Sequence, residues 1–172
     1  RAILEIIDND NTSSSYPTPS GTVNITNLSD FTNASNAGKT ATITGSFSAS
    51  SATAAANMVL VAGGGVISGG NINLNGSGIS PSNGGQIFSS NASFSSIYDK
   101  SRISINVFGA TSGDSSDDNS AIVTAINNAQ HLTCTLNGQY IKNNHTNFTR
   151  SGFVDWDING AIIATTSASN FN

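Results

Sequence analysis

Charge is scarce in this chain of 172 residues, and positive charge is scarcer still. Only 9% of the residues are charged, and ten acidic against six basic residues give a net charge of −4. Proteins that bind nucleic acid need a basic surface for the phosphates, so this balance excludes a nucleic-acid partner. No apolar run approaches the roughly 18 residues of a membrane span, so we expect no membrane insertion. The single cysteine, Cys134, excludes an internal disulfide framework, and we expect it to be buried.

Small polar residues take the place of charge. The sequence contains 28 serines, 23 asparagines and 17 threonines, which make up 68 of the 172 residues, and glycine adds 17 more. This composition lacks the combined richness in Ala, Glu, Lys and Leu that is typical of helical bundles and coiled coils. Disordered chains combine low hydrophobicity with high net charge, whereas 37% of this chain is hydrophobic. A β-rich fold with many polar turns therefore remains.

Short β-like clusters recur along the chain, separated by glycine-containing turns, and in most of them apolar residues alternate with Thr or Asn. This period of two is typical of strands with one buried face. Short strands joined by polar turns suit a coil of roughly 20 residues or more that stacks on the next coil. We therefore predict an all-β fold built from short-strand parallel β-helix, or solenoid, modules. The clusters are Thr22–Thr26, Thr40–Thr44, Asn57–Val61, Gly65–Ile67, Asn71–Asn75, Gln86–Phe88, Leu132–Leu136, Gln139–Ile141, Gly152–Trp156 and Ala161–Ile163.

One short α-helix is predicted over residues 117–129. Asp117 and Asp118 can offer side-chain oxygens to the free N–H groups of its first turn, and their charge favours the positive end of the helix dipole. An apolar stripe of small side chains then follows at helical spacing, so the helix should lie flat on an apolar surface. The stripe consists of Ala121, Ile122, Ala125, Ile126 and Ala129. Residues 48–57 can also form a helical turn.

The stretch from Ile105 to Ala129 carries a recognisable order of short motifs. They are Val107-Phe108-Gly109-Ala110, Gly113-Asp114, Asp117-Asp118, Ala121-Ile122 and Ala125-Ile126. This order resembles the entry motif of pectate-lyase-like right-handed β-helix proteins, with which many bacteriophage tailspikes and tail fibres begin their receptor-binding β-helix. The resemblance implies that the helix caps the open N-terminal end of that β-helix, which would cover exposed strand edges. The family's usual Gly-Asp-Gly turn is Gly113-Asp114-Ser115 here.

A second stretch, Gly64–Ile79 together with Gln86–Phe88, is similar to a small β-coil module that precedes the main β-helix in some phage tail proteins and related surface enzymes. The two resemblances divide the chain into three parts. Residues 1–20 would be a virion-anchor segment and linker, and residues 21–98 the small β-coil module. Residues 99–172 would be a connector, the capping helix and the first turns of a truncated parallel β-helix.

The resemblance implies a structural virion component of the phage tail that acts at the bacterial cell surface. Such a protein would be a homotrimer, bound through its N-terminus to other phage tail proteins, and would adsorb to host surface polysaccharide through a distal part beyond this sequence. One alternative is the N-terminal part of a polysaccharide lyase or glycoside hydrolase, with its catalytic residues beyond Asn172. Another is a bacterial surface adhesin.

Asp155, Trp156 and Asp157 are the candidate sugar-contact residues. Paired carboxylates about 5–9.5 Å apart can hydrolyse glycosidic bonds, and an indole ring between them can stack on a sugar. The alternative is a solvated strand face with Trp156 turned inward. We expect no catalytic residue in this segment.

The remaining chemistry-bearing residues predict structure. Asp114, Asp117 and Asp118 form an acidic cluster, but no glutamate follows at the end of the loop as in a calcium site, so we assign them to the helix-cap motif. That motif as a whole comprises Phe108, Gly109, Ala110, Gly113, Asp114, Asp117 and Asp118. His131 and His145 have no second metal ligand nearby, and we expect neither a metal nor a cofactor.

Overall fold

The structure, a computed structural model, describes residues 18–80, 83–98, 103–142 and 154–164. It is 29% strand and 17% helix, in agreement with the predicted all-β class. Among the described residues, every paired strand runs parallel to its partner. Parallel partners cannot be joined by tight hairpins, so the chain must travel away from each strand and return before it lays down the next.

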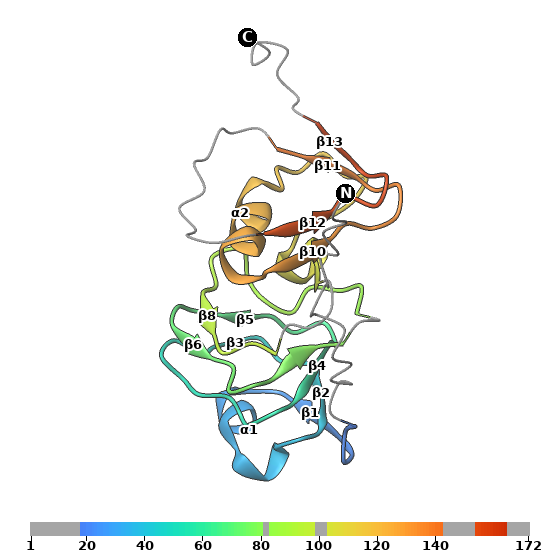
Figure 1. The fold of residues 1–172 in the computed structure, drawn as a ribbon. Coiled ribbons are helices and arrows are strands. Elements are labelled where there is room, and N and C mark those ends of the chain that lie inside the picture. The colour runs from blue at the N-terminus through green and yellow to red at the C-terminus, as the bar shows by residue number, and fades with distance from the viewer. Residues whose placement is uncertain (1–17, 81–82, 99–102, 143–153, 165–172) are drawn as a thin grey trace, which may run out of the picture.

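The described part of the chain contains thirteen strands and four short helices, whose arrangement is shown in Figure 1. The first eight strands are β1 (Thr22–Ile25), β2 (Thr40–Ile43), β3 (Phe47–Ser48), β4 (Val59–Ala62), β5 (Ile67–Ser68), β6 (Ile72–Asn73), β7 (Gly78–Ile79) and β8 (Phe94–Ser95). The other five are β9 (Ile103–Ser104), β10 (His131–Thr133), β11 (Gln139–Ile141), β12 (Asp155–Asp157) and β13 (Ile162–Ala164). The helices are α1 (Leu28–Thr32), α2 (Asn119–Asn128) and the 3-10 helices η1 (Ala34–Asn36) and η2 (Ile105–Phe108).

The N-terminal strands pair at a nearly constant distance along the chain. In the sheet β1-β2-β4-β7, Thr22 lies beside Thr40, Thr40 beside Val59 and Val59 beside Gly78, so successive partners are 18 or 19 residues apart. The two-stranded sheets β3-β5 and β6-β8 follow the same scheme. In Figure 1 these strands are stacked along the long axis of an elongated molecule.

The C-terminal strands repeat this arrangement in the sheets β9-β10-β12 and β11-β13. His131 lies beside Asp155, and Gln139 lies beside Ile162. Ile103 of β9 pairs with Leu132 of β10 across a longer stretch of chain, because α2 is inserted between these two strands.

Alternation along the strands directs apolar side chains into a shared core, as the sequence predicts. Ala41, Leu60 and Ile79 form one such row across β2, β4 and β7, and all three are buried. The neighbouring Thr40 and Thr42 are only partly buried. One or two buried side chains from each short strand are enough to fill the core because the strands stack directly on each other.

Helix α1 is absent from the sequence-based prediction. Asn27 precedes it and accepts the Asp30 N–H at 3.1 Å through its side chain, which is the usual role of an N-cap residue. Phe31 is fully buried, and its ring lies 5.7 Å from the Phe47 ring. Five residues are too few to give a helical period in the sequence. The helical turn considered for residues 48–57 is not formed, and Thr53 instead makes a parallel bridge to Asn73.

Helix α2 begins and ends within the predicted range, and its predicted stripe is buried from Ala121 to Ala129. It also contacts the N-terminal strands. Its Thr124 hydroxyl donates to the Ser90 carbonyl oxygen, and the Asn128 side chain bonds to Ala92 and Phe94. Helix α2 therefore covers the 90–94 segment, which includes the start of β8.

Three phenylalanines join the strands before and after residue 100. The Phe94 and Phe108 rings are stacked 6.0 Å apart, and Phe88 lies 4.7 Å from Phe94 and 6.4 Å from Phe108. The backbone N–H groups of Ile87 and Phe88 both donate to the Val107 carbonyl oxygen. Offset stacking of aromatic rings adds to the free energy of burying them.

One predicted strand is shorter than its pattern suggests. The alternation from Leu132 to Leu136 predicts that both leucines share a buried face with Cys134. Leu132 and Cys134 are buried, but Leu136 is 66% exposed. The reason is a turn closed by the Gly138 N–H and the Thr135 carbonyl oxygen, with Asn137 at a φ of 53°, a conformation that asparagine tolerates better than most residues.

Candidate functional site

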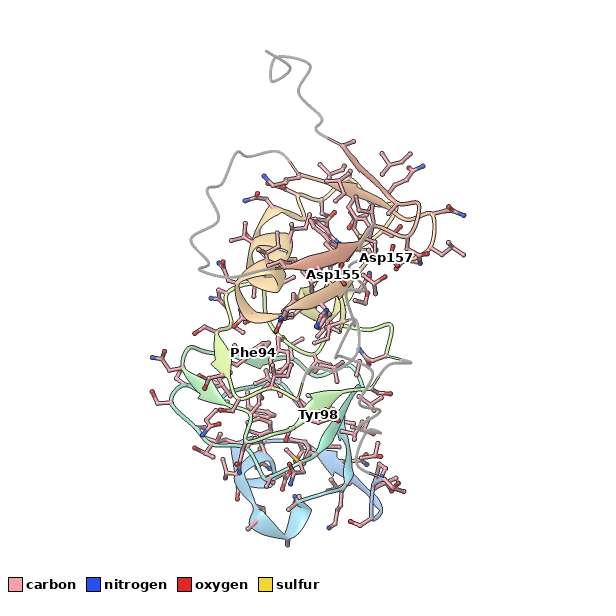
Figure 2. The ribbon with its side chains drawn as sticks, viewed as in Figure 1. Phe94, Tyr98, Asp155 and Asp157 are labelled. Carbon is pink, nitrogen blue, oxygen red and sulfur yellow. The ribbon has the colours of Figure 1, made fainter. Side chains whose placement is uncertain are left out.

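The three sugar-contact candidates form strand β12, with Asp155 and Asp157 labelled in Figure 2. Register places Asp155 beside His131 and Asp157 beside Thr133, and Thr133 in turn lies beside Ser104. Side chains at alternate positions share one face of a strand. The β9-β10-β12 sheet therefore has an outward face composed of hydroxyl, carboxylate and imidazole groups.

Both carboxylates interact with nearby groups of the same chain. Asp155 Oδ2 lies 3.6 Å from His131 Nδ1, an ion pair whenever the imidazole is protonated. Asp157 Oδ1 accepts the Asn159 N–H at 3.0 Å, which shapes the turn after β12. Residues two apart along a strand are separated by about 6.6 Å of backbone, and the catalytic carboxyl groups of glycosidases lie about 5–9.5 Å apart. The polar groups of this face can form hydrogen bonds with the hydroxyl groups of a ligand.

Trp156 lies on the other face of β12. It is half-buried and packs against the core, while its neighbour in register, Leu132, is fully buried. Its indole Nε1 is buried and interacts with the Cys134 side chain, which is also buried. The ring therefore packs on the core, and Trp156 is turned inward, as in the alternative interpretation of the sequence. A stacking platform for a sugar between the two aspartates is not formed.

Cys134 is buried beside this sheet, as expected from the sequence. Burial raises the pKa of the Cys134 thiol. A thiol with a raised pKa carries little thiolate at neutral pH and is a poor nucleophile, so Cys134 acts as a small apolar core residue.

The helix-cap motif divides into residues with different tasks. Asp117 behaves as predicted, because its Oδ1 accepts the Asn119 N–H at the start of α2 at 3.0 Å. Asp114 Oδ1 accepts the Ser116 N–H at 3.1 Å within its own turn. Asp118 occupies the N-cap position, yet its side chain makes no capping hydrogen bond. The expectation that Asp118 caps the helix through its carboxylate is therefore wrong.

The Asp118 carboxylate instead joins two distant segments of backbone. It is 4% exposed, and its two oxygens accept the Thr111 N–H at 2.8 Å and the Ile141 N–H at 2.9 Å. The Asp118 N–H also donates to the Ile141 carbonyl oxygen at 2.7 Å. Burial of a carboxylate is tolerated when both oxygens accept hydrogen bonds. Asp118 therefore holds β11 against the start of the α2 segment.

The Phe-Gly-Ala part of the motif has clear structural roles. Phe108 and Ala110 are buried. Gly109 ends η2 at a φ of +97°, and a Cβ there would lie 2.8 Å from Gln86 Nε2. Gly113 has a φ of +82°, and its N–H donates to the Gln139 carbonyl oxygen. Both glycines therefore occupy positions that disfavour a side chain.

Asn106, whose side chain makes four hydrogen bonds, was missed in the sequence analysis. Its Oδ1 accepts from the Ser104, Thr135 and Tyr140 hydroxyls at 2.7, 3.1 and 3.0 Å, and its Nδ2 donates to the Ala110 carbonyl oxygen at 2.8 Å. Asparagine is so common in this chain that nothing in the sequence distinguishes this one.

No metal or membrane feature occurs in the part of the chain that the structure describes. No group of three or more His, Cys, Asp or Glu side chains in it could hold a metal ion. No helix among the same residues is long and apolar enough to cross a bilayer. His131 contacts Asp155 as described above, and His145 lies outside the described residues, as do residues 1–17 of the predicted anchor.

Comparison of the chain with protein-family models, with curated proteins and with solved structures found no match.

Proposed function

We propose that this chain is the N-terminal attachment and stem part of a bacteriophage tailspike or tail fibre, built as a parallel β-helix that adsorbs to host surface polysaccharide. The observation that carries the proposal is the parallel pairing of successive strands at short, similar intervals, from Thr22 beside Thr40 to Gln139 beside Ile162. A chain that stacks on itself in this way gains length along one axis with every turn. Such a rod suits a mechanical role between the virion and the cell.

Helix α2 supports the same interpretation. Helix α2 lies between the N-terminal strands and β10. Its side chains bond to the 90–94 segment, and its apolar stripe packs on the core. A helix that covers strand edges at the start of a stack prevents unwanted edge-to-edge pairing. In the proposed protein, α2 covers the N-terminal end of a second β-helical stack, which is formed by the C-terminal strands β10 to β13.

The oligomer we propose is a homotrimer, attached through its N-terminus to other phage tail proteins and located in the virion. Three large aliphatic side chains near the C-terminal end support self-association: Leu136, Ile158 and Ile162 are 66%, 46% and 58% exposed. Light scattering on the purified 172-residue chain tests this proposal. We expect the mass of a trimer, and a well-folded monomer would contradict the trimeric stem.

A polysaccharide-degrading enzyme is the second candidate, because Asp155 and Asp157 stand at alternate positions on one face of β12, and glycosidases use a pair of carboxylates. The two candidates differ in one measurement, the release of new sugar ends from capsular or pectic polysaccharide by this chain. A stem predicts no release by this segment, since any hydrolytic residues would lie beyond Asn172. Release that is lost in Asp155→Asn and Asp157→Asn variants would favour the enzyme.

A bacterial surface adhesin is the third candidate, and it shares the polar outward face. Genomic context distinguishes it from a virion protein. Virion genes beside the gene for this chain would support the stem, and a secretion signal upstream of Arg1 would favour the adhesin.

A further inference from the structure

Four Asn-Gly steps occur in the sequence, at residues 75–76, 83–84, 137–138 and 159–160, and all four are described by the structure. An asparagine before glycine is chemically labile, because no Cβ on the next residue hinders the approach of its backbone nitrogen to the carboxamide carbon. We propose that Asn159 is the site at which the folded protein undergoes spontaneous deamidation, and that the fold protects the other three steps. This inference does not depend on the proposed function.

The turn that contains Asn159 leaves both reacting groups accessible. Asn159 and Gly160 have φ angles of 52° and 71°, and the Ala161 N–H donates to the Ile158 carbonyl oxygen at 2.9 Å, as in a type I′ turn. Both residues are exposed. The Gly160 N–H has no acceptor among the described residues. Within the same described residues, the Asn159 carboxamide makes one long hydrogen bond, from Nδ2 to the Cys134 carbonyl oxygen at 3.4 Å.

At two of the other Asn-Gly steps, the glycine nitrogen that would attack already donates a hydrogen bond. The Gly76 N–H donates to the Ser96 carbonyl oxygen at 2.8 Å, and Asn75 Nδ2 donates to the Ala54 carbonyl oxygen at 3.2 Å. The Gly138 N–H donates to the Thr135 carbonyl oxygen at 2.9 Å, and Gly138 is buried. Attack at either step requires that this hydrogen bond open first.

The fourth step has its carboxamide fixed at both ends. Asn83 Oδ1 accepts the Ala62 N–H at 2.7 Å, and Asn83 Nδ2 donates to the Gly85 carbonyl oxygen at 2.7 Å. The side chain therefore replaces a peptide group at the end of β4. Rotation of this carboxamide toward the Gly84 nitrogen would break two short hydrogen bonds, so its reaction also requires local opening.

The proposed reaction needs only water as a co-reactant. The Gly160 nitrogen attacks Asn159 Cγ, its proton passes to the departing Nδ2, and ammonia leaves as a succinimide ring forms. Water then adds to one of the two ring carbonyls and opens the ring to aspartate or isoaspartate. One water is consumed, one ammonia is released, and nothing is oxidised or reduced. The product carries a new carboxylate two residues from Asp157.

Peptide mapping of the intact 172-residue chain tests the proposal, because cleavage after Lys and Arg separates the sites. Peptide 151–172 holds Asn159, peptide 103–142 holds Asn137, and peptide 40–100 holds Asn75 and Asn83, which fragment ions distinguish. After incubation at mildly alkaline pH, we expect deamidation at Asn159 to be about tenfold faster than at the other three asparagines. At those three, local hydrogen bonds must break before the reaction, and breaking them costs free energy. In denaturant the four rates should converge.

An Asn159→Gly variant is the matched control, since glycine accepts the positive φ of this turn. In this variant the rapid deamidation of peptide 151–172 must disappear while the other three rates stay unchanged. Equal rates at all four steps in the folded protein would overturn the proposal. So would a rate at Asn159 that rises only when the chain unfolds.

Discussion

The side chain of Asn128 pairs with the backbone at Phe94 in the manner of a neighbouring strand. Asn128 Oδ1 accepts the Phe94 N–H at 2.8 Å, and Nδ2 donates to the Ala92 carbonyl oxygen at 3.2 Å. Nδ2 also donates to the Thr124 carbonyl oxygen of its own helix at 2.8 Å. A carboxamide has the same donor and acceptor as a peptide group. Through this one residue, α2 ends the hydrogen bonding of β8 without adding another strand.

Replacing Asn128 by alanine should therefore destabilise the junction between α2 and β8. Asn128→Ala leaves the Phe94 N–H and the Ala92 carbonyl oxygen without their partner, and the loss of bonds to partly buried groups costs about 1–3 kcal/mol. We expect a lower free energy of unfolding in urea and faster hydrogen exchange at the Phe94 amide. The neighbouring Asn127, which is exposed, provides the control. An Asn127→Ala variant with an equal loss would contradict the specific role of Asn128.

Asp118 gives a second prediction, because both of its oxygens accept backbone N–H groups in a buried position. Asp118→Asn keeps the size of the side chain but turns one acceptor into a donor, which then faces the N–H of Thr111 or Ile141. We expect the free energy of unfolding to fall by about 2–4 kcal/mol, since a buried donor loses its partner and a charged hydrogen bond is lost.

Asp114→Asn is the matched control for Asp118. Asp114 accepts the Ser116 N–H within an exposed turn, and an amide oxygen can replace the carboxylate in that bond. We expect a change within about 0.5 kcal/mol. If urea unfolding gave similar losses for the two variants, the carboxylate of Asp118 would not be joining the two segments as described.

The features of the fold that were predictable from the sequence are those with a repeating pattern. Alternation marked β2 through Ala41 and Ile43, and helical spacing marked the buried stripe of α2 through Ala121 and Ala125. Both patterns arise because one face of a regular element must be buried. The parallel pairing followed from the shortness of these clusters and from the interval between them.

The features that were missed depend on single contacts between residues distant in the chain. Asp118 looked like a cap because its position relative to α2 is correct, but Thr111 and Ile141 compete for its oxygens. Leu136 continued an alternating pattern, yet the turn at Asn137 turned it outward. Among 23 asparagines, local pattern did not identify Asn106 and Asn128, because their partners are set only by the folded chain.

Gly45 gives a third prediction, since its Cα packs directly on the backbone of Thr26, the residue that follows β1. A Cβ at this position would overlap the Thr26 carbonyl group and lie 2.8 Å from the Thr26 Cα. Backbone cannot move aside without separating β1 from β2, so we expect Gly45→Ala to lower the free energy of unfolding by about 3 kcal/mol. Gly84, around which there is open space, is the control. The free energy of unfolding of a Gly84→Ala variant should lie within about 0.5 kcal/mol of that of the parent.

Asp30 gives a prediction about pH. Its Oδ2 accepts the Thr26 hydroxyl at 2.6 Å and the Thr26 N–H at 3.0 Å. The hydrogen bond from the Thr26 hydroxyl, reinforced by the backbone bond, lowers the pKa of the Asp30 carboxyl below its ordinary value. Since the unfolded chain then binds the proton more readily, Asp30 stabilises the fold above the ordinary carboxyl pKa of about 3.9 and loses this effect as pH falls through the lower folded value.

An Asp30→Asn variant should therefore unfold at a lower urea concentration than the parent near neutral pH, and the difference should shrink as the pH is lowered below about 4. Urea unfolding at a series of pH values measures this difference. Ser29→Asn, which adds an amide at the neighbouring exposed position of α1, is the control and should shift the midpoint equally at every pH. A difference between Asp30→Asn and the parent that stayed constant down to low pH would show that the Thr26 hydrogen bonds do not depend on the charge of Asp30.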